Sequence, residues 1–164
     1  MDMVAPLEIG ISCDDLDRMV RFYTDLMGCS LVNVIDMPAE KAKNTPFAKA
    51  GYRVARLQTP MGERIKFLEP VADRAPVADV PEVLLREGRF FLAFIVQDLD
   101  TLLETLEAAG VDMLTGYEKI EVRPGFHLAL AVDPEGNVIE FNEYADIASY
   151  RGDLAASSQH GLAS

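Results

Sequence analysis

The sequence is poor in cysteine, in basic residues and in long hydrophobic runs. Among its 164 residues, Cys13 and Cys29 are the only two cysteines, and they lack CxxC spacing. Two thiols make no disulfide framework, so we expect both to be reduced in a cytoplasmic protein. The hydrophobic runs are far too short for a membrane helix, and we expect no signal peptide.

Positive charge is scarce. The chain has 15 Lys and Arg residues against 27 Asp and Glu residues, which gives a net charge of −12. No basic cluster offsets the repulsion of a polyanion, so nucleic acid and anionic membranes are excluded as expected partners. Apolar residues make up 49% of the chain, enough to build the core of one domain or of two small modules.

The chain contains an internal repeat, in which SCDDLDRMVRFYTDLMGCSLV at 12–32 corresponds to VQDLDTLLETLEAAGVDML at 96–114. Each copy has an apolar strand, then the triplet DLD, an amphipathic helix and a glycine. The apolar helix positions share one face: Leu16, Met19, Val20, Tyr23, Leu26 and Met27 in the first copy, and Leu99, Leu102, Leu103, Leu106 and Ala109 in the second. We expect Asp14 or Asp15, and Gln97 or Asp98, at the helix N-caps, as helix-start residues and not metal ligands.

Three strands are predicted after each helix. They are CSLVNVI, GYRVARLQ and ERIKFLE in the first copy, and VDMLTGY, GFHLALAV and NVIEFNEY in the second. The fold class is therefore α+β, with two βαβββ modules that form a cupped mixed sheet with helices on its outer face. We expect the first module at 1–69, a linker at 70–87, the second module at 88–146 and a C-terminal tail at 147–164. A polar insert at 36–50 is expected either to be an ordinary surface loop or to cover a site.

Strand parity predicts which side chains line the trough, meaning the concave side of the sheets opposite the helices. The inward set is Glu8, Gly10, Ser12, Val54, Arg56, Gln58, Arg64, Lys66, Leu68, Phe91, Ala93, Ile95, Phe126, Leu128, Leu130, Glu140 and Asn142. His127 falls on the other face. A register slip of one residue in a hairpin would exchange the inward and outward sets, so the faces of His127 and Arg56 depend on the register.

Glu140 lies in an otherwise apolar strand, VIEF. A charge at such a position is costly unless it is paired, bound to a metal or facing a wet cavity. With Glu140 facing the trough, the trough is an apolar pocket with a few converging charges, which is typical of small-molecule sites.

Four segments together resemble the vicinal oxygen chelate superfamily, which includes glyoxalase I, fosfomycin-resistance proteins, bleomycin-resistance proteins and extradiol dioxygenases. They are DDLDRMVRFYTDLMG, FLAFIVQDLD, LEAAGV and DPEGNVIEF. The resemblance implies paired βαβββ modules, a site inside the cupped sheet and often two chains per functional unit. We therefore expect a homodimer, and a cytoplasmic location, as is typical of bacterial members.

The resemblance also implies where a metal would bind. In the enzymes of the superfamily, the ligands come from positions that match Glu8, Lys66, Phe91 and Glu140. Only Glu140 keeps the usual residue type, because a protonated lysine and a phenylalanine offer a metal no donor. We therefore expect no metal cofactor. The alternative is a rebuilt site in which Glu8 and Glu140 hold a divalent cation with Asn142 and water.

Three functions remain open. The first is a metal-independent isomerase, epimerase or lyase that acts next to a carbonyl group, with Glu140 as base, Lys66 as electrophile or anion anchor, and Glu8 as a second acid–base group. The alternative, purely structural role for these charges is a salt bridge of Lys66 with Glu8 or Glu140. The second is a binding protein that sequesters a small molecule, and the third is the metal enzyme. Expected substrate contacts are Arg56, Phe91, Phe126, Leu128, Leu130 and Asn142.

Overall fold

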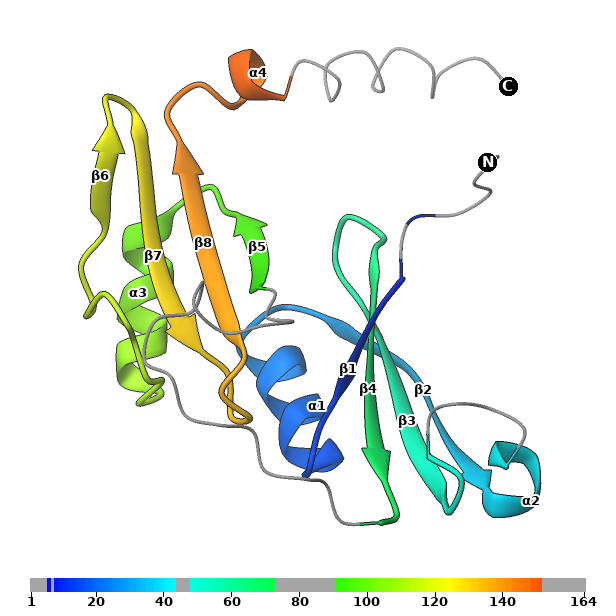
Figure 1. Cartoon of the computed structure of the whole chain (residues 1–164). Helices are drawn as coiled ribbons and strands as arrows, with labels where there is room; N and C mark the ends of the chain where they lie inside the picture. Colours follow the sequence, from blue (N-terminus) through cyan, green and yellow to red (C-terminus); the bar gives the residue numbers. More distant parts are fainter. Residues whose placement is uncertain (1–5, 7, 44–47, 73–90, 152–164) are drawn as a thin grey trace, which may run out of the picture. The chain divides into compact units, whose positions relative to one another are not determined.

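The computed structural model describes residue 6 and residues 8–43, 48–72 and 91–151 (Figure 1). The chain divides into two units. Unit 1 is Met1–Glu87 with the turn Asp133–Gly136, and unit 2 is Gly88–Val132 with Asn137–Ser164. Most of the predicted linker and tail lies outside the described residues. In the described part of the chain, no helix is long and apolar enough to cross a membrane.

Unit 1 is a four-stranded sheet with one long helix against it. Its elements are β1 (Glu8–Ser12), α1 (Leu16–Asp25), β2 (Ser30–Pro38), α2 (Ala39–Ala42), β3 (Gly51–Gln58) and β4 (Arg64–Pro70). The strand order is β1-β4-β3-β2, and only the β1–β4 pair is parallel. The core lies between this sheet and α1, where the ring of Tyr23 packs 4.7 Å from that of Phe67.

Unit 2 repeats the arrangement. Its elements are β5 (Phe91–Ile95), α3 (Leu99–Ala108), β6 (Ile120–Arg123), β7 (Phe126–Val132), β8 (Val138–Tyr144) and α4 (Ile147–Tyr150). The order β5-β8-β7-β6, with β5 and β8 parallel, matches that of unit 1. Leu103, Leu106, Ile139 and Phe141 are buried between the sheet and α3. The predicted α+β fold of two βαβββ modules is confirmed.

The strand predicted at VDMLTGY, residues 111–117, is wrong. This segment runs beside β7 but forms only an isolated bridge, between Met113 and Ala131. The Thr115 hydroxyl takes the place of a backbone partner by accepting from the Leu130 N–H, and Gly116 then adopts a φ of 71°. A side-chain acceptor and a left-handed residue interrupt the ladder, so the edge strand β6 begins only at Ile120.

Both DLD triplets start helices, as the sequence predicts. Asp15 Oδ1 accepts from the Arg18 N–H at 2.9 Å, and Asp98 Oδ1 accepts from the Thr101 N–H at 3.0 Å. Of the alternatives left open, Asp15 and Asp98 are therefore the N-caps.

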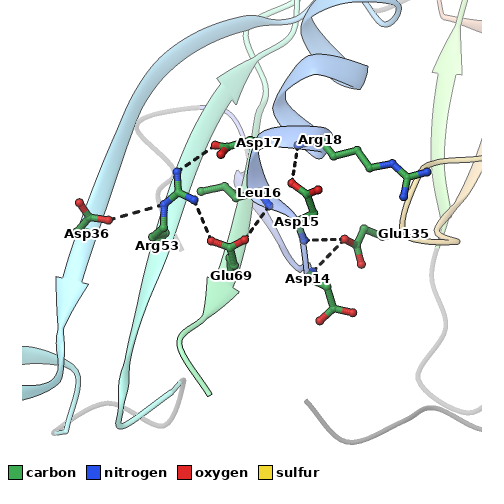
Figure 2. Close-up of polar contacts among 9 residues, drawn as sticks. All are labelled: Asp14, Asp15, Leu16, Asp17, Arg18, Asp36, Arg53, Glu69 and Glu135. Atoms are coloured by element: carbon green, nitrogen blue, oxygen red, sulfur yellow. Dashed lines mark hydrogen bonds and ion pairs between the residues drawn. The ribbon is translucent and has the colours of Figure 1, made fainter. Parts of the chain in front are cut away.

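A second acceptor at each helix start was missed by the sequence analysis. Glu69 of β4 accepts from the Leu16 N–H at 3.1 Å, and its other oxygen binds Arg53 (Figure 2). The equivalent Glu143 of β8 accepts from the Leu99 N–H at 3.0 Å and binds Lys119. Each long helix is thus tied by a carboxylate to the last strand of its own sheet.

Glu135 makes a third contact of this kind in unit 1. Its Oε1 accepts from the backbone N–H groups of Asp14 and Asp15, at 3.0 and 2.8 Å (Figure 2). The turn that carries Glu135 thereby supplies an anion to the N-terminal end of α1, where the helix dipole favours negative charge.

The Glu143 contact gives a pH-dependent prediction. The Leu99 N–H and the Lys119 ammonium hold the pKa of Glu143 below its ordinary value, against the opposing effect of burial. A lowered pKa stabilises the fold above the pKa of the unfolded chain, and this contribution is lost as pH falls through the folded value. We expect Glu143→Gln to lower the free energy of unfolding at neutral pH by about 1 kcal/mol.

Denaturant unfolding across the acid range measures this effect. The loss caused by Glu143→Gln should shrink toward acid pH, because the wild-type carboxylate is then protonated too. The exposed Glu121 of the same sheet is the control, and Glu121→Gln should leave the free energy of unfolding at neutral pH unchanged. A Glu143→Gln deficit that stays constant with pH would show that the charge of Glu143 contributes nothing.

Candidate functional site

Each sheet has an open face, defined here as the face opposite its long helix. Strand registers place the whole predicted inward set on these faces, and most of the alternate residues are buried toward the helices. His127 lies on the helix side as predicted, with its Nδ1 4.0 Å from a Glu143 oxygen. Neither hairpin has slipped, so the sequence assigned the faces correctly.

The open face of unit 1 carries a cluster of charges around Glu8. Lys66 Nζ lies 3.0 Å from Glu8 Oε2, and Arg64 Nη1 lies 3.6 Å from Glu8 Oε1. The Lys66 ammonium, helped by the charges of Arg64 and Arg56, holds the pKa of Glu8 below its ordinary value. Glu8 is therefore ionised at neutral pH, and it is the carboxylate with which Lys66 pairs.

Helix α2 covers the other end of this face. Ala42 of α2 is fully buried against Tyr52 and Val54 of β3, and Met37, Ala48 and Leu68 pack around them. Tyr52 and Val54 lie on the same face of β3 as Arg56, by strand parity. The described part of the 36–50 insert thus packs on the apolar half of the open face of unit 1, and its role as cover of a site stays a prediction.

The open face of unit 2 carries Glu140 among apolar side chains. Glu140 lies on β8 between Ala93 of β5 and Leu130 of β7 in the strand register. One carboxylate oxygen accepts from Asn142 Nδ2 at 3.1 Å. Among the residues that the structure describes, no cation lies within 4 Å of this carboxylate.

Asn142 leaves a polar atom without a partner. The residue is 7% exposed, and within the described ranges its buried Oδ1 has no hydrogen-bond partner. A buried acceptor in this state costs about 1–3 kcal/mol. A ligand with a donor group beside Asn142 would recover that energy.

An aromatic stack stands at one end of the same face. Phe126 and Tyr144 stack with ring centroids 4.5 Å apart, and Tyr150 of α4 stacks on Tyr144 at 4.1 Å. The Arg123 guanidinium lies 5.5 Å from the centre of the Phe126 ring. Burial away from water and the hydrogen bond with the Tyr150 hydroxyl raise the pKa of Tyr144 to about 12. Tyr144 is therefore a neutral hydrogen-bonding group at physiological pH.

The residues at the four positions implied for a metal do not fit one. In unit 1, the Glu8 carboxylate already forms an ion pair with the Lys66 ammonium. In unit 2, Phe91 has no atom that could donate to a metal. Glu140, which is hydrogen-bonded to Asn142, is then the position in this unit that offers a metal-binding group. Across the described residues, no group of three or more His, Cys, Asp or Glu side chains is placed to hold a metal ion.

The predicted site residues thus form two sets, each described within its own unit. Unit 1 brings together Glu8, Lys66, Arg56 and Arg64. Unit 2 brings together Phe91, Phe126, Leu128, Leu130, Glu140 and Asn142 on one face. An encounter of Glu140 with Glu8 or Lys66 stays a prediction.

Four residues that bear on these faces were not predicted from the sequence: Asn33, Arg123, Tyr144 and Tyr150. The sequence signal that could have found Tyr144 is strand alternation, which places it on the same face of β8 as Glu140 and Asn142. Nothing in the local pattern predicted that α4 returns Tyr150 to that ring.

Comparison with known proteins agrees with this fold. Residues 5–141 match the family described as "Glyoxalase/Bleomycin resistance protein/Dioxygenase superfamily". No curated protein sequence matches the chain. Similar solved structures are a glyoxalase family protein from Bacillus cereus and the glyoxalase I enzymes of Leishmania major and Zea mays.

The structural similarity is broad, but the sequences have diverged. The Bacillus cereus protein has a TM-score of 0.73 and 18% identity over 88% of this chain and 96% of its own. The Leishmania major enzyme has a TM-score of 0.57 and 22% identity over 96% and 97%. The Zea mays enzyme has a TM-score of 0.59 and 22% identity over 87% of this chain and 45% of its own. The TM-scores show a shared fold, and at identities this low the similarity shows the fold alone.

Proposed function

The chain belongs to the Glyoxalase/Bleomycin resistance protein/Dioxygenase superfamily, and we propose that it is a metal-independent enzyme that moves a proton next to a carbonyl group of a small organic substrate. The reaction is an isomerisation, an epimerisation or a lyase step. Glu140 takes a proton from the carbon beside the carbonyl, and the electron pair of the C–H bond passes toward the carbonyl oxygen. The proton is then returned to carbon, or the electron pair expels a leaving group from the adjacent carbon and Glu140 passes its proton to that leaving group or to water.

The observation that supports this proposal is the pair formed by Glu140 and Asn142. Glu140 is a partly buried carboxylate on an apolar face, and its hydrogen-bond donor in the described structure is a neutral amide. A base held this way keeps its lone pairs for a substrate proton, whereas a salt bridge to a cation would weaken it. The buried Asn142 Oδ1 offers a substrate donor an acceptor beside Glu140.

Glu8 supports the function in a different way. A carboxylate whose pKa is lowered by Lys66 is a weak base. We therefore assign Glu8 to holding the Lys66 ammonium in place, rather than to the second acid–base role predicted from the sequence.

The second candidate function is sequestration of a small molecule, as the bleomycin-resistance branch of the resemblance suggests. The stack of Phe126, Tyr144 and Tyr150 favours it, because aromatic faces bind planar ligands without any chemistry. This candidate expects tight binding with no turnover.

Two further properties complete the proposal. We propose a cytoplasmic homodimer, as predicted from the sequence. The apolar side chains Leu31, Val32, Val34 and Ile35 support the dimer, because they are 38–46% exposed on the edge strand β2.

Hydrogen exchange into small carbonyl compounds tests the proposal. We expect the wild-type protein in D2O to replace the hydrogen next to the carbonyl of a compound that it accepts, as measured by proton NMR. The protein should be purified without chelator or added metal, and its metal content should be measured together with that of Glu140→Gln. Near-stoichiometric metal that the variant loses would make Glu140 a ligand and would replace proton transfer with the metal alternative.

A further inference from the structure

The open face of unit 1 has an excess of positive charge in a strongly acidic chain. Its strand residues include Arg56, Arg64 and Lys66 against the single carboxylate of Glu8, whereas the whole chain has a net charge of −12. Such a local reversal of sign concentrates anions at the face.

Arg56 is the one of these three cations that makes no ion pair with Glu8 within 4 Å. It stands directly opposite Lys66 in the β3–β4 register, and like charges in directly opposed positions destabilise an antiparallel pair. Glu8 contacts Lys66 and Arg64, whereas the described partner of Arg56 is the neutral Asn33 Oδ1, at 3.2 Å. Among the residues that the structure describes, no carboxylate lies within 4 Å of the Arg56 guanidinium.

Apolar surface borders these cations. Val54 precedes Arg56 by two residues on β3, and Leu68 follows Lys66 by two on β4, so all four side chains share the face. Val54 and Leu68 belong to the cluster that α2 covers. Val54 is only 5% exposed beneath α2, whereas Leu68 is partly buried. A ligand that fits here has an anionic end for Arg56 and Lys66 and a carbon skeleton for Leu68.

We propose that this face binds the carboxylate or phosphate group of a small organic anion, with Arg56 and Lys66 as the anion-binding residues. The Arg56 guanidinium offers a planar pair of N–H donors, and the Lys66 ammonium adds a point charge beside it. Glu8 keeps Lys66 on the face and makes no direct ion pair with Arg56, on which its charge acts only at longer range. Anion binding at this face does not depend on the proposed function, but the assignment of the bound anion as the substrate rests on it.

Calorimetric titration of the full chain tests the site, with inorganic phosphate and succinate as separate probes at constant ionic strength. We expect saturable binding of one probe, and the probe that binds identifies the anionic group. Arg56→Gln should weaken that binding by about tenfold or more, since a charged hydrogen-bond donor is lost. Lys66→Gln should act in the same direction.

The control is Arg18→Gln. Arg18 is an exposed cation of the same unit, on α1, so its loss changes the net charge equally and should leave the affinity within about twofold. Without ligand, Arg56→Gln should not lower stability, because it removes a like-charge pair. If neither probe binds saturably, or if Arg18→Gln weakens binding as much as Arg56→Gln, the site is refuted. Binding is measured without turnover, so its failure leaves the proposed role of Glu140 standing.

Discussion

Replacing Glu140 with glutamine should lower the rate of proton exchange by about 100- to 10,000-fold, the usual contribution of a positioned general base. Glutamine has the same shape but cannot take up a proton. Its Oε1 can still accept from Asn142 Nδ2, which donates to the Glu140 carboxylate at 3.1 Å in the wild type. The free energy of unfolding should therefore stay unchanged while the chemistry is lost.

The matched control for this variant is Glu104→Gln. Glu104 is an exposed residue on α3 of the same unit, so the variant carries the same charge change on the helix side of the unit. Exchange rates and unfolding curves of both variants should be measured beside the wild type. Equal exchange in Glu140→Gln and the wild type would remove Glu140 from catalysis and favour sequestration.

Features that depend on local periodicity could be predicted from the sequence. The apolar spacing and the DLD triplets located both long helices, because helix amphipathicity and N-caps are set within a few residues. Alternation in VIEFN placed Glu140 and Asn142 on one face, because the side-chain period of a strand is two. These local signals carry most of the candidate site.

Features that depend on distant partners could not be predicted. Glu69 and Leu16 are 53 residues apart, and Glu143 and Leu99 are 44 apart, so neither helix contact leaves a local pattern. The sequence offered Glu8 and Glu140 equally as the partner of Lys66, and it was the β1–β4 register that brought Glu8 to Lys66. The strand expected at 111–117 does not form, for a related reason. The Thr115 hydroxyl accepts a hydrogen bond from the backbone N–H of Leu130, 15 residues away in the sequence.

Gly51→Ala should destabilise the fold by about 2–5 kcal/mol, as the sum of backbone strain and overpacking. Gly51 has a φ of 102°, a conformation that alanine rarely adopts. It also pairs with Pro38, where β2 leads into α2. A Cβ at this position would lie 2.8 Å from the Met37 carbonyl oxygen and 3.3 Å from the Ala39 nitrogen. Both neighbours are backbone atoms, so the clash displaces the chain itself.

Gly62→Ala separates the two causes. Gly62 has a φ of 101° in the same unit, but an added Cβ there meets nothing within 4 Å. Its substitution should cost only the backbone term, about 1–2 kcal/mol. The additional loss of unfolding free energy in Gly51→Ala, relative to Gly62→Ala, measures the close approach of β3 to residues 37–39. The same close approach holds α2 against the open face. Denaturant unfolding gives both values, and amide hydrogen exchange of residues 37–43 should accelerate in Gly51→Ala alone. Equal costs at the two glycines would mean that the start of α2 shifts freely, and the cover over Tyr52 and Val54 would then be loose rather than fixed.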